Sequence, residues 1–244
     1  MLSMIEQLKR RLGMDAPKIL KKWINAKSNS GYTALHFASY KGSYVLICTL
    51  IEEGAEIEVS NNDGLNVLHM AAQANQPLSL VYFKEKYSMN LMSVDEVGST
   101  PLHWAAYTGS KEALIYLLSW NVDVNAQDKE GLTPLHLAVI SGILLLKVDK
   151  TQLIIKLLQK GASKDLKDSK DRDPMTLAKE KNKNKIYELL NEKNKCKLFT
   201  MKVPLTKLEK SRVNVYIFLI LHLTISLINF FVNIIGEKSK IKLN

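Results

Sequence analysis

A short phrase that returns at a nearly constant interval constrains this chain more than any other feature of its 244 residues. The phrase ends in leucine and histidine and occurs at residues 33–36 (Thr-Ala-Leu-His), 66–69 (Asn-Val-Leu-His), 100–103 and 133–136 (both Thr-Pro-Leu-His). The intervals are 33, 34 and 33 residues. Such a period is typical of solenoids, in which each helical unit buries its apolar face only against its neighbours. We therefore expect an all-α stack that works through its surface.

The residues around the phrase predict the form of each unit. A polar turn ending in glycine precedes each phrase, and glycine adopts a positive φ at little cost. An alanine follows each histidine by two residues and allows adjacent helices to approach closely. The turn glycines are Gly31, Gly64, Gly98 and Gly131, and the alanines are Ala38, Ala71, Ala105 and Ala138. The pattern resembles the ankyrin-repeat family over roughly residues 31–190.

The resemblance implies five units in an ankyrin solenoid, preceded by partial capping helices in residues 1–30. The units are expected at residues 31–63, 64–97, 98–130, 131–170 and 171–190. The fourth unit contains an insertion at residues 143–150, with an extended first helix as the alternative. The fifth is a degenerate cap whose outer face is rich in lysine: Lys179, Lys181, Lys183 and Lys185. Because Asn75 replaces the glycine of other units and Pro77 follows it, we expect an irregular second helix around residues 79–86.

The repeat histidines are interpreted as structural. In the ankyrin family the hydroxyl and imidazole of this phrase form hydrogen bonds within and between repeats. The residues expected in this ladder are Thr33, His36, His69, Thr100, His103, Thr133 and His136. Because they lie one repeat apart, they cannot converge on one metal ion. We expect no metal, no cofactor, no small-molecule substrate and no catalytic residue in this chain.

The charge distribution argues against nucleic acid as a partner. The formal net charge is +10, but ten Lys and Arg against three acids lie from Asn191 onward, which leaves +3 for the first 190 residues. The repeats are therefore nearly balanced in charge, and no aromatic-basic nucleic-acid signature occurs. The basic excess belongs to a linker at residues 191–212 that precedes an uncharged segment.

That uncharged segment, residues 213–236, predicts a transmembrane helix. Its 24 residues would rise about 36 Å, enough for a hydrocarbon core of roughly 30 Å. Seven Lys or Arg precede it and three follow it in the tail, residues 237–244. The positive-inside rule then places the repeats in the cytosol, on a membrane such as the Golgi. The alternative is a buried or interfacial helix, favoured by polar residues such as Asn229 and Asn233.

A narrower resemblance rests on residues 69–73 (His-Met-Ala-Ala-Gln), residues 100–107 (Thr-Pro-Leu-His-Trp-Ala-Ala-Tyr) and the basic linker before the span. These features are similar to the N-terminal half of ankyrin-repeat DHHC protein S-acyltransferases, the palmitoyltransferases. The resemblance implies that the repeats recruit protein substrates through extended peptide segments, and that Trp104 grips the peptide. No two histidines are adjacent in this sequence, so the DHHC motif itself is absent from it.

The candidate partner-binding residues are aromatic and charged side chains expected on the surface of the first helices and turns. They are Tyr32, Tyr40, Glu96, Trp104, Tyr107 and Lys129. The alternative for Trp104 is burial between repeats. Three functions stay open: an anchored adaptor, the recruiting half of a palmitoyltransferase, and the N-terminal part of an ankyrin-bearing ion channel. The basic linker and residues 213–236 are expected to contact lipid.

Overall fold

The structure is a computed structural model that describes residues 16–141 and 151–191, together with residues 7, 10, 11 and 13. Within these residues the regular elements are α-helices, and no strand occurs. The helices are α2 (Ala16–Ile24), α3 (Ala34–Lys41), α4 (Tyr44–Glu52), α5 (Val67–Gln73), α6 (Pro77–Tyr87), α7 (Pro101–Thr108), α8 (Lys111–Ser119), α9 (Pro134–Ile140), α10 (Thr151–Gln159), α11 (Pro174–Glu180) and α12 (Asn184–Asn191).

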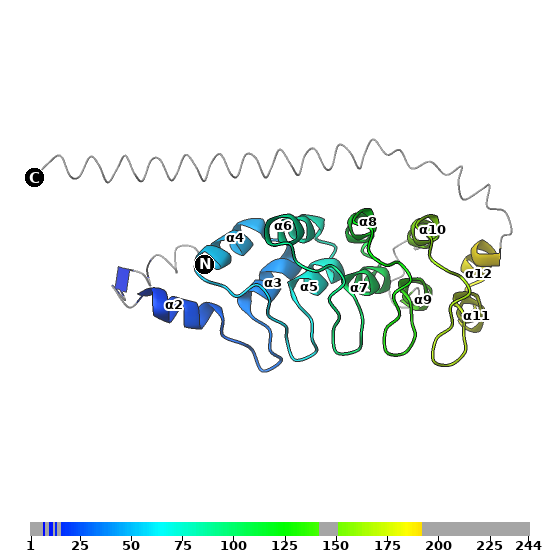
Figure 1. Ribbon diagram of the computed structural model, residues 1–244, viewed down its shortest axis with the longest axis horizontal. Coiled ribbons are helices and arrows are strands. Elements are labelled where there is room, and N and C mark those ends of the chain that lie inside the picture. Colours follow the sequence, from blue (N-terminus) through cyan, green and yellow to red (C-terminus); the bar gives the residue numbers. More distant parts are fainter. Residues whose placement is uncertain (1–6, 8–9, 12, 14–15, 142–150, 192–244) are drawn as a thin grey trace, which may run out of the picture. The chain divides into compact units, whose positions relative to one another are not determined.

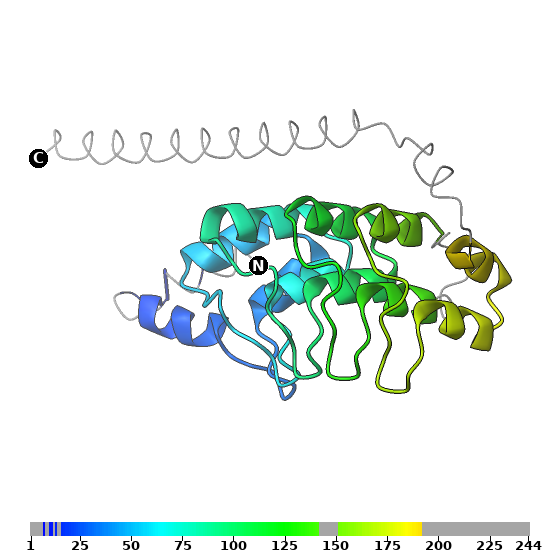
Figure 2. The same cartoon turned by 45° about the vertical axis from the view of Figure 1, so that its right-hand side comes forward.

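The helices form hairpins that stack in two layers. The first helices of the hairpins, α3, α5, α7, α9 and α11, pack one against the next, and the second helices, α4, α6, α8, α10 and α12, form the other layer (Figures 1 and 2). Long turns project from the layer of first helices. The core between the layers consists of aliphatic side chains with almost no exposure, such as Leu68, Leu102 and Leu135. The fold is therefore the helical solenoid that the repeat period predicts.

The first residue of each phrase starts a helix. Thr33, Asn66, Thr100 and Thr133 are the N-caps of α3, α5, α7 and α9, each in extended backbone, and each forms a capping box with the histidine three residues later. A capping side chain supplies partners to helix N–H groups that would otherwise lack them. The recurring phrase is thus a helix start signal repeated once per hairpin.

The projecting turns are joined to one another by backbone hydrogen bonds. Asn62 N donates to Ser30 O (3.1 Å), Glu96 N to Asp63 O (2.9 Å), Lys129 N to Val97 O (2.9 Å) and Ser169 N to Glu130 O (2.7 Å). Each turn glycine has a φ between 74° and 83°. The glycines keep the turns tight enough for this row of bonds, which holds the turn tips at a fixed spacing.

The expectation of an irregular second helix in the second repeat is wrong. Helix α6 runs without interruption from Pro77 to Tyr87, 11 residues. Pro77 occupies the first turn, where its missing N–H removes no helical hydrogen bond. Asn75 adopts the positive φ (57°) that glycine takes in other repeats, a conformation that asparagine tolerates better than most residues.

The expectation that the lysines of the terminal unit lie on its outer face is wrong for Lys183. Lys179, Lys181 and Lys185 are exposed, but the ammonium of Lys183 points back and donates to the carbonyls of Val139 and Ile140 (3.3 Å for the second). These carbonyls lie at the end of α9, where helical partners are lacking. Burial lowers the pKa of Lys183.

Several sequence-based expectations lie outside the described residues. They are the insertion at residues 143–150, all of the linker at 191–212 except Asn191, the span at 213–236 and the tail at 237–244. Among the residues that are described, no helix has the length and apolarity needed to cross a bilayer. At the N-terminus, α2 buries Ala16, Leu20 and Ile24 and lies within residues 1–30, where capping helices are expected.

A pair of glycine substitutions tests the row of turn tips. A Cβ on Gly64 would lie 2.7 Å from Glu96 N and 2.9 Å from Asp95 Cα, whereas a Cβ on Gly161 would meet nothing within 4 Å. Both glycines have positive φ (78° and 91°). Gly161→Ala is therefore expected to cost about 1–2 kcal/mol, and Gly64→Ala about 2–4 kcal/mol because the backbone clash adds to the strain. Urea unfolding of both variants measures the difference; equal costs would contradict the account.

Candidate functional site

The four repeat histidines bridge neighbouring repeats. The Nδ1 of each ring lies against its own N-cap, and the Nε2 reaches the carbonyl just before the next N-cap. The Nε2–O distances are 3.0 Å from His36 to Leu65, 3.1 Å from His69 to Ser99, 3.1 Å from His103 to Leu132 and 3.2 Å from His136 to Arg172. All four rings are buried. Both ring nitrogens of each histidine are therefore engaged within the chain, and the four side chains connect neighbouring repeats.

The hydrogen bonds define the protonation of the three rings whose N-cap is threonine, those of His36, His103 and His136. A carbonyl can only accept, so Nε2 carries the proton, and Nδ1 accepts from the backbone N–H of the cap, as from Thr33 (3.2 Å) and Thr100 (3.1 Å). The threonine hydroxyls lie 2.8–2.9 Å from Nδ1 and can donate to it. Burial lowers the pKa of all four histidines, which favours this neutral form.

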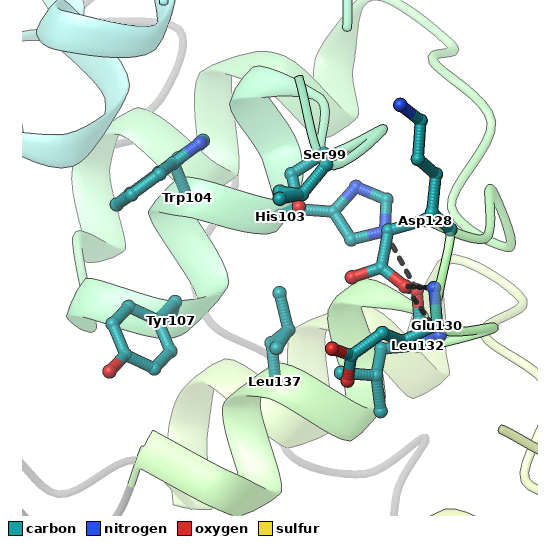
Figure 3. A pocket seen from close by; sticks show the side chains of 10 residues that line it. Ser99, His103, Trp104, Tyr107, Asp128, Glu130, Leu132 and Leu137 are labelled. Carbon is teal, nitrogen blue, oxygen red and sulfur yellow. Dashed lines mark hydrogen bonds between the residues drawn. The ribbon is translucent and has the colours of Figure 1, made fainter. Parts of the chain in front are cut away.

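A groove opens between the third and fourth repeats, on the side of the first helices and turns (Figure 3). Its volume is about 340 Å³. Helix α7 supplies one wall, and α9 with the turn after α8 supplies the other. The lining residues are Val97, Ser99, His103, Trp104, Tyr107, Asp128, Lys129, Glu130, Leu132 and Leu137. The groove is mostly apolar at its walls and carries charged groups at the turn.

Trp104 is a partly exposed wall of this groove. Its Nε1 donates to Asp95 Oδ2 over 2.8 Å, and its ring meets Tyr107 edge to face, with 6.3 Å between centroids and an interplanar angle of 86°. Asp95 is itself held, because its Oδ1 accepts from Val97 N and Ser99 N. The indole is therefore fixed in orientation before any partner arrives, while one part of it stays open.

The predicted binding residues fall into two places. Trp104, Tyr107 and Lys129 line the groove, and Glu96 is exposed on the preceding turn tip. Tyr32 and Tyr40 lie two repeats away, in the first unit. The structure therefore does not bring the six residues into one site.

The sequence reasoning missed Phe37, which is 54% exposed and lies 5.6 Å from Tyr32 between ring centroids. Phe37 follows His36 just as Trp104 follows His103, so the repeat register was a signal that could have found it. The same position is buried in the second repeat, as Met70, and forms part of the groove in the fourth, as Leu137. Aromatic residues at this position thus form two separate exposed patches.

No cluster of three or more His, Cys, Asp or Glu suited to a metal ion occurs among the described residues. Charged side chains of the turns form ion pairs instead, such as that of Arg172 with Asp168 at 2.6 Å. The lining of the groove consists of aromatic, aliphatic and charged side chains.

Comparison with protein families gives three overlapping matches. Models described as ankyrin repeats match residues 24–77, 68–149 and 130–169. Together they cover residues 24–169, which is more than half of the chain. The chain belongs to the ankyrin-repeat family. Ankyrin repeats mediate protein–protein interactions, and the groove lies in this part of the chain.

Curated relatives match over the repeats. The human transient receptor potential cation channel subfamily A member 1 is 26% identical over 176 residues, covering 70% of this chain and 15% of that protein. Palmitoyltransferase AKR1 of Lachancea kluyveri is 29% identical over 133 residues (53% and 17%). The putative palmitoyltransferase ZDHHC13 of Danio rerio is 30% identical over 132 residues (54% and 19%). The chain thus spans less than a fifth of the length of these relatives.

The histidine ladder makes stability depend on pH. Because each folded-state pKa lies below the ordinary 6.5, the unfolded chain binds more protons as the pH falls below that value. The stabilisation is complete above about pH 6.5 and is lost as the pH falls from there toward the folded-state pKa values. Thermal melts at pH 7.5 and 5.5, the latter above the carboxylate range, should show a lower midpoint at pH 5.5. An unchanged midpoint would refute the neutral ladder.

Proposed function

We propose that this chain is a membrane-anchored, cytosol-facing module that recruits protein partners by binding an extended peptide segment along its first helices and turns. The observation that carries the proposal is the groove walled by Trp104 and Tyr107. Aromatic side chains held in place by neighbouring groups are frequent anchor points of protein interfaces. The fixed indole of Trp104 lowers the ordering cost of binding, because its hydrogen bond to Asp95 already orients it.

An extended ligand suits the layout of this surface. The exposed aromatic patches at Phe37 and at Trp104 lie two repeats apart on the same layer of first helices. Helices pack about 8–10 Å apart, so a chain of roughly six extended residues would span the two patches. Backbone groups at the turn tips are already paired with one another. Side-chain contacts would therefore provide most of the specificity.

Membrane anchoring rests on sequence alone. Residues 213–236 carry no charge, and the basic linker at residues 191–212 precedes them. The proposed location is a membrane, endomembranes such as the Golgi included, with the repeats on the cytosolic side. Lysines in the linker would add about 1 kcal/mol each near anionic headgroups.

The repeats could belong to either of two kinds of longer protein. In the first, the repeats are the substrate-recruiting part of a palmitoyltransferase, which the names of two relatives and Trp104 favour. In the second, they belong to the N-terminal part of an ion channel, which the longer match to a cation-channel protein favours. Sequencing the full transcript separates them from a self-contained adaptor. A downstream Asp-His-His-Cys segment supports the transferase, a pore loop between spans supports the channel, and a stop codon after Asn244 supports the adaptor.

Peptide selection tests the groove directly. A displayed library of 12-residue peptides is selected against the full-length chain in neutral detergent. Trp104→Ala should weaken binding of the selected peptides at least tenfold, because it removes one wall of the groove. The unfolding free energy should fall by no more than about 1–2 kcal/mol, as expected for a partly exposed side chain.

Trp23→Ala is the matched control, because Trp23 on α2 is 54% exposed and lies outside the groove. It should leave peptide affinity unchanged. Equal effects of the two substitutions would contradict the proposed site, and collapse of the fold in Trp104→Ala would make Trp104 a core residue.

Membrane attachment has its own test. The full chain expressed in cells is expected to remain in the membrane pellet after alkaline carbonate extraction, because a spanning helix is not released by high pH. The repeats should be digested by protease added outside intact microsomes. Release by carbonate would overturn the span, and protection of the repeats would overturn the orientation.

A further inference from the structure

Four turns of the solenoid carry an Asp or Asn at the same position, and their side chains are used in the same way. In Asn61, Asp95, Asp128 and Asp168, the Oδ1 atom accepts from the backbone N–H groups two and four residues later, over 2.7–3.0 Å. These bonds shape the turn. The position therefore leaves one further side-chain atom, Nδ2 or Oδ2, for another partner.

In three of the four turns that further atom is engaged within the chain. Asn61 Nδ2 donates to Asp63 Oδ2 (3.1 Å), Asp95 Oδ2 accepts from Trp104 Nε1 (2.8 Å), and Asp168 Oδ2 accepts from Arg172 Nε (2.9 Å) and Nη2 (2.6 Å). For Asp128, no donor among the described residues contacts Oδ2, and the residue lines the groove. A carboxylate oxygen thus faces the groove without a partner.

The equivalent carboxylate oxygen in the next turn, Asp168 Oδ2, shows which donor suits this position. At the next turn, the guanidinium of Arg172 holds Asp168 through two nitrogen atoms. Burial alone would raise the pKa of Asp168, but the hydrogen bonds from Arg172 outweigh it and the pKa is lowered. A paired guanidinium therefore stabilises the charged carboxylate of this turn. Asp128 has the same turn geometry, and the residue equivalent to Arg172 is Leu132, which cannot donate from its side chain.

The rest of the groove suits a cationic group with an apolar stem. Its lining holds two carboxylates, Asp128 and Glu130, against the single ammonium of Lys129, and Asp95 lies behind the indole of Trp104. The wall opposite Asp128 is formed by Trp104 and Tyr107 (Figure 3). A guanidinium can stack on an aromatic face while it pairs with a carboxylate, and its methylene stem packs on apolar surface.

We propose that the groove is an arginine subsite, in which an arginine of the partner peptide stacks on Trp104 or Tyr107 and pairs with the open carboxylate oxygen of Asp128. The inference rests on the proposed peptide-binding function and specifies the chemistry of its ligand. Arginine fits better than lysine, because a planar guanidinium offers two parallel N–H donors and an aromatic-stacking face. Non-specific attraction does not account for such a preference, since the chain has a formal net charge of +10.

Asp128→Asn tests the subsite without disturbing the turn. Asn61 shows that asparagine forms the same turn bonds through Oδ1, so the variant should fold. Asp165→Asn is the matched control: it removes the same charge from an exposed residue outside the groove. The same 12-residue library is selected in parallel against the wild type, Asp128→Asn and Asp165→Asn, each full length in neutral detergent. Arginine should be enriched severalfold with the wild type and the control, and not with Asp128→Asn.

A change on the ligand side keeps the test decisive if Asp128→Asn fails to fold. Selected peptides are resynthesised with arginine replaced by citrulline, which keeps the shape and loses the charge. This replacement should weaken binding at least fivefold in the wild type and less than twofold in Asp128→Asn. Peptides that bind through Trp104 but show no arginine enrichment, or no citrulline effect in the wild type, overturn the subsite and leave the peptide-binding function standing. Selection that yields no peptide sensitive to Trp104→Ala overturns both.

Discussion

The bridge from a buried histidine to the next repeat supports the rest of this structure. Each Nε2 reaches a carbonyl 29–36 residues further along the chain, immediately before the next N-cap. The bond therefore couples the start of one hairpin to the start of the following one. Together with the backbone bonds between turn tips, it sets a fixed offset from repeat to repeat. A surface groove formed by two repeats can have a defined shape only because this offset is constant.

The same repeat position is packed in the core of one unit and lines the groove in others. The residue after the histidine is buried as Met70 in the second repeat. It is a partly exposed wall of the groove as Trp104 in the third repeat and lines the groove as Leu137 in the fourth. The turn aspartate also differs between units. Asp95 Oδ2 accepts a hydrogen bond from Trp104 Nε1, whereas Asp128 Oδ2 has no donor among the described residues. Variation within a fixed frame thus concentrates aromatic and acidic groups between repeats three and four.

Much of the fold follows from the sequence because the signals repeat. The phrase ending in Leu-His, the turn glycines and the alanines recur with one period. A weak signal in one unit is therefore supported by the same signal in the others. The expected irregularity at residues 79–86 is wrong because it rests on two residue types that often interrupt a helix. Pro77 lies in the first turn of α6, where proline is tolerated, and Asn75 adopts the positive φ that glycine has in other repeats. Lys183 was misplaced because its partners are carbonyls of α9, more than 40 residues away.

The candidate site was only partly predictable for a physical reason. Trp104, Tyr107 and Lys129 were recognisable as large or charged residues near the phrase, but the groove depends on side chains from two repeats. The difference between Asp128 and the other turn aspartates becomes visible only when its hydrogen bonds are compared with those of Asp95 and Asp168. The three aspartates have the same charge and the same place in the repeat, and only the partners of their Oδ2 atoms distinguish them.

The central claim is that a peptide binds at the groove between the third and fourth repeats. The chain has three tryptophans, Trp23, Trp104 and Trp120, and only Trp104 lines the groove. Fluorine NMR of the full-length chain labelled with 5-fluorotryptophan, titrated with a selected peptide, reports on each of them separately. The account predicts that the Trp104 resonance shifts in proportion to occupancy while the other two stay in place. A shift confined to Trp23 or Trp120, or a saturated complex with no shift at Trp104, would contradict it.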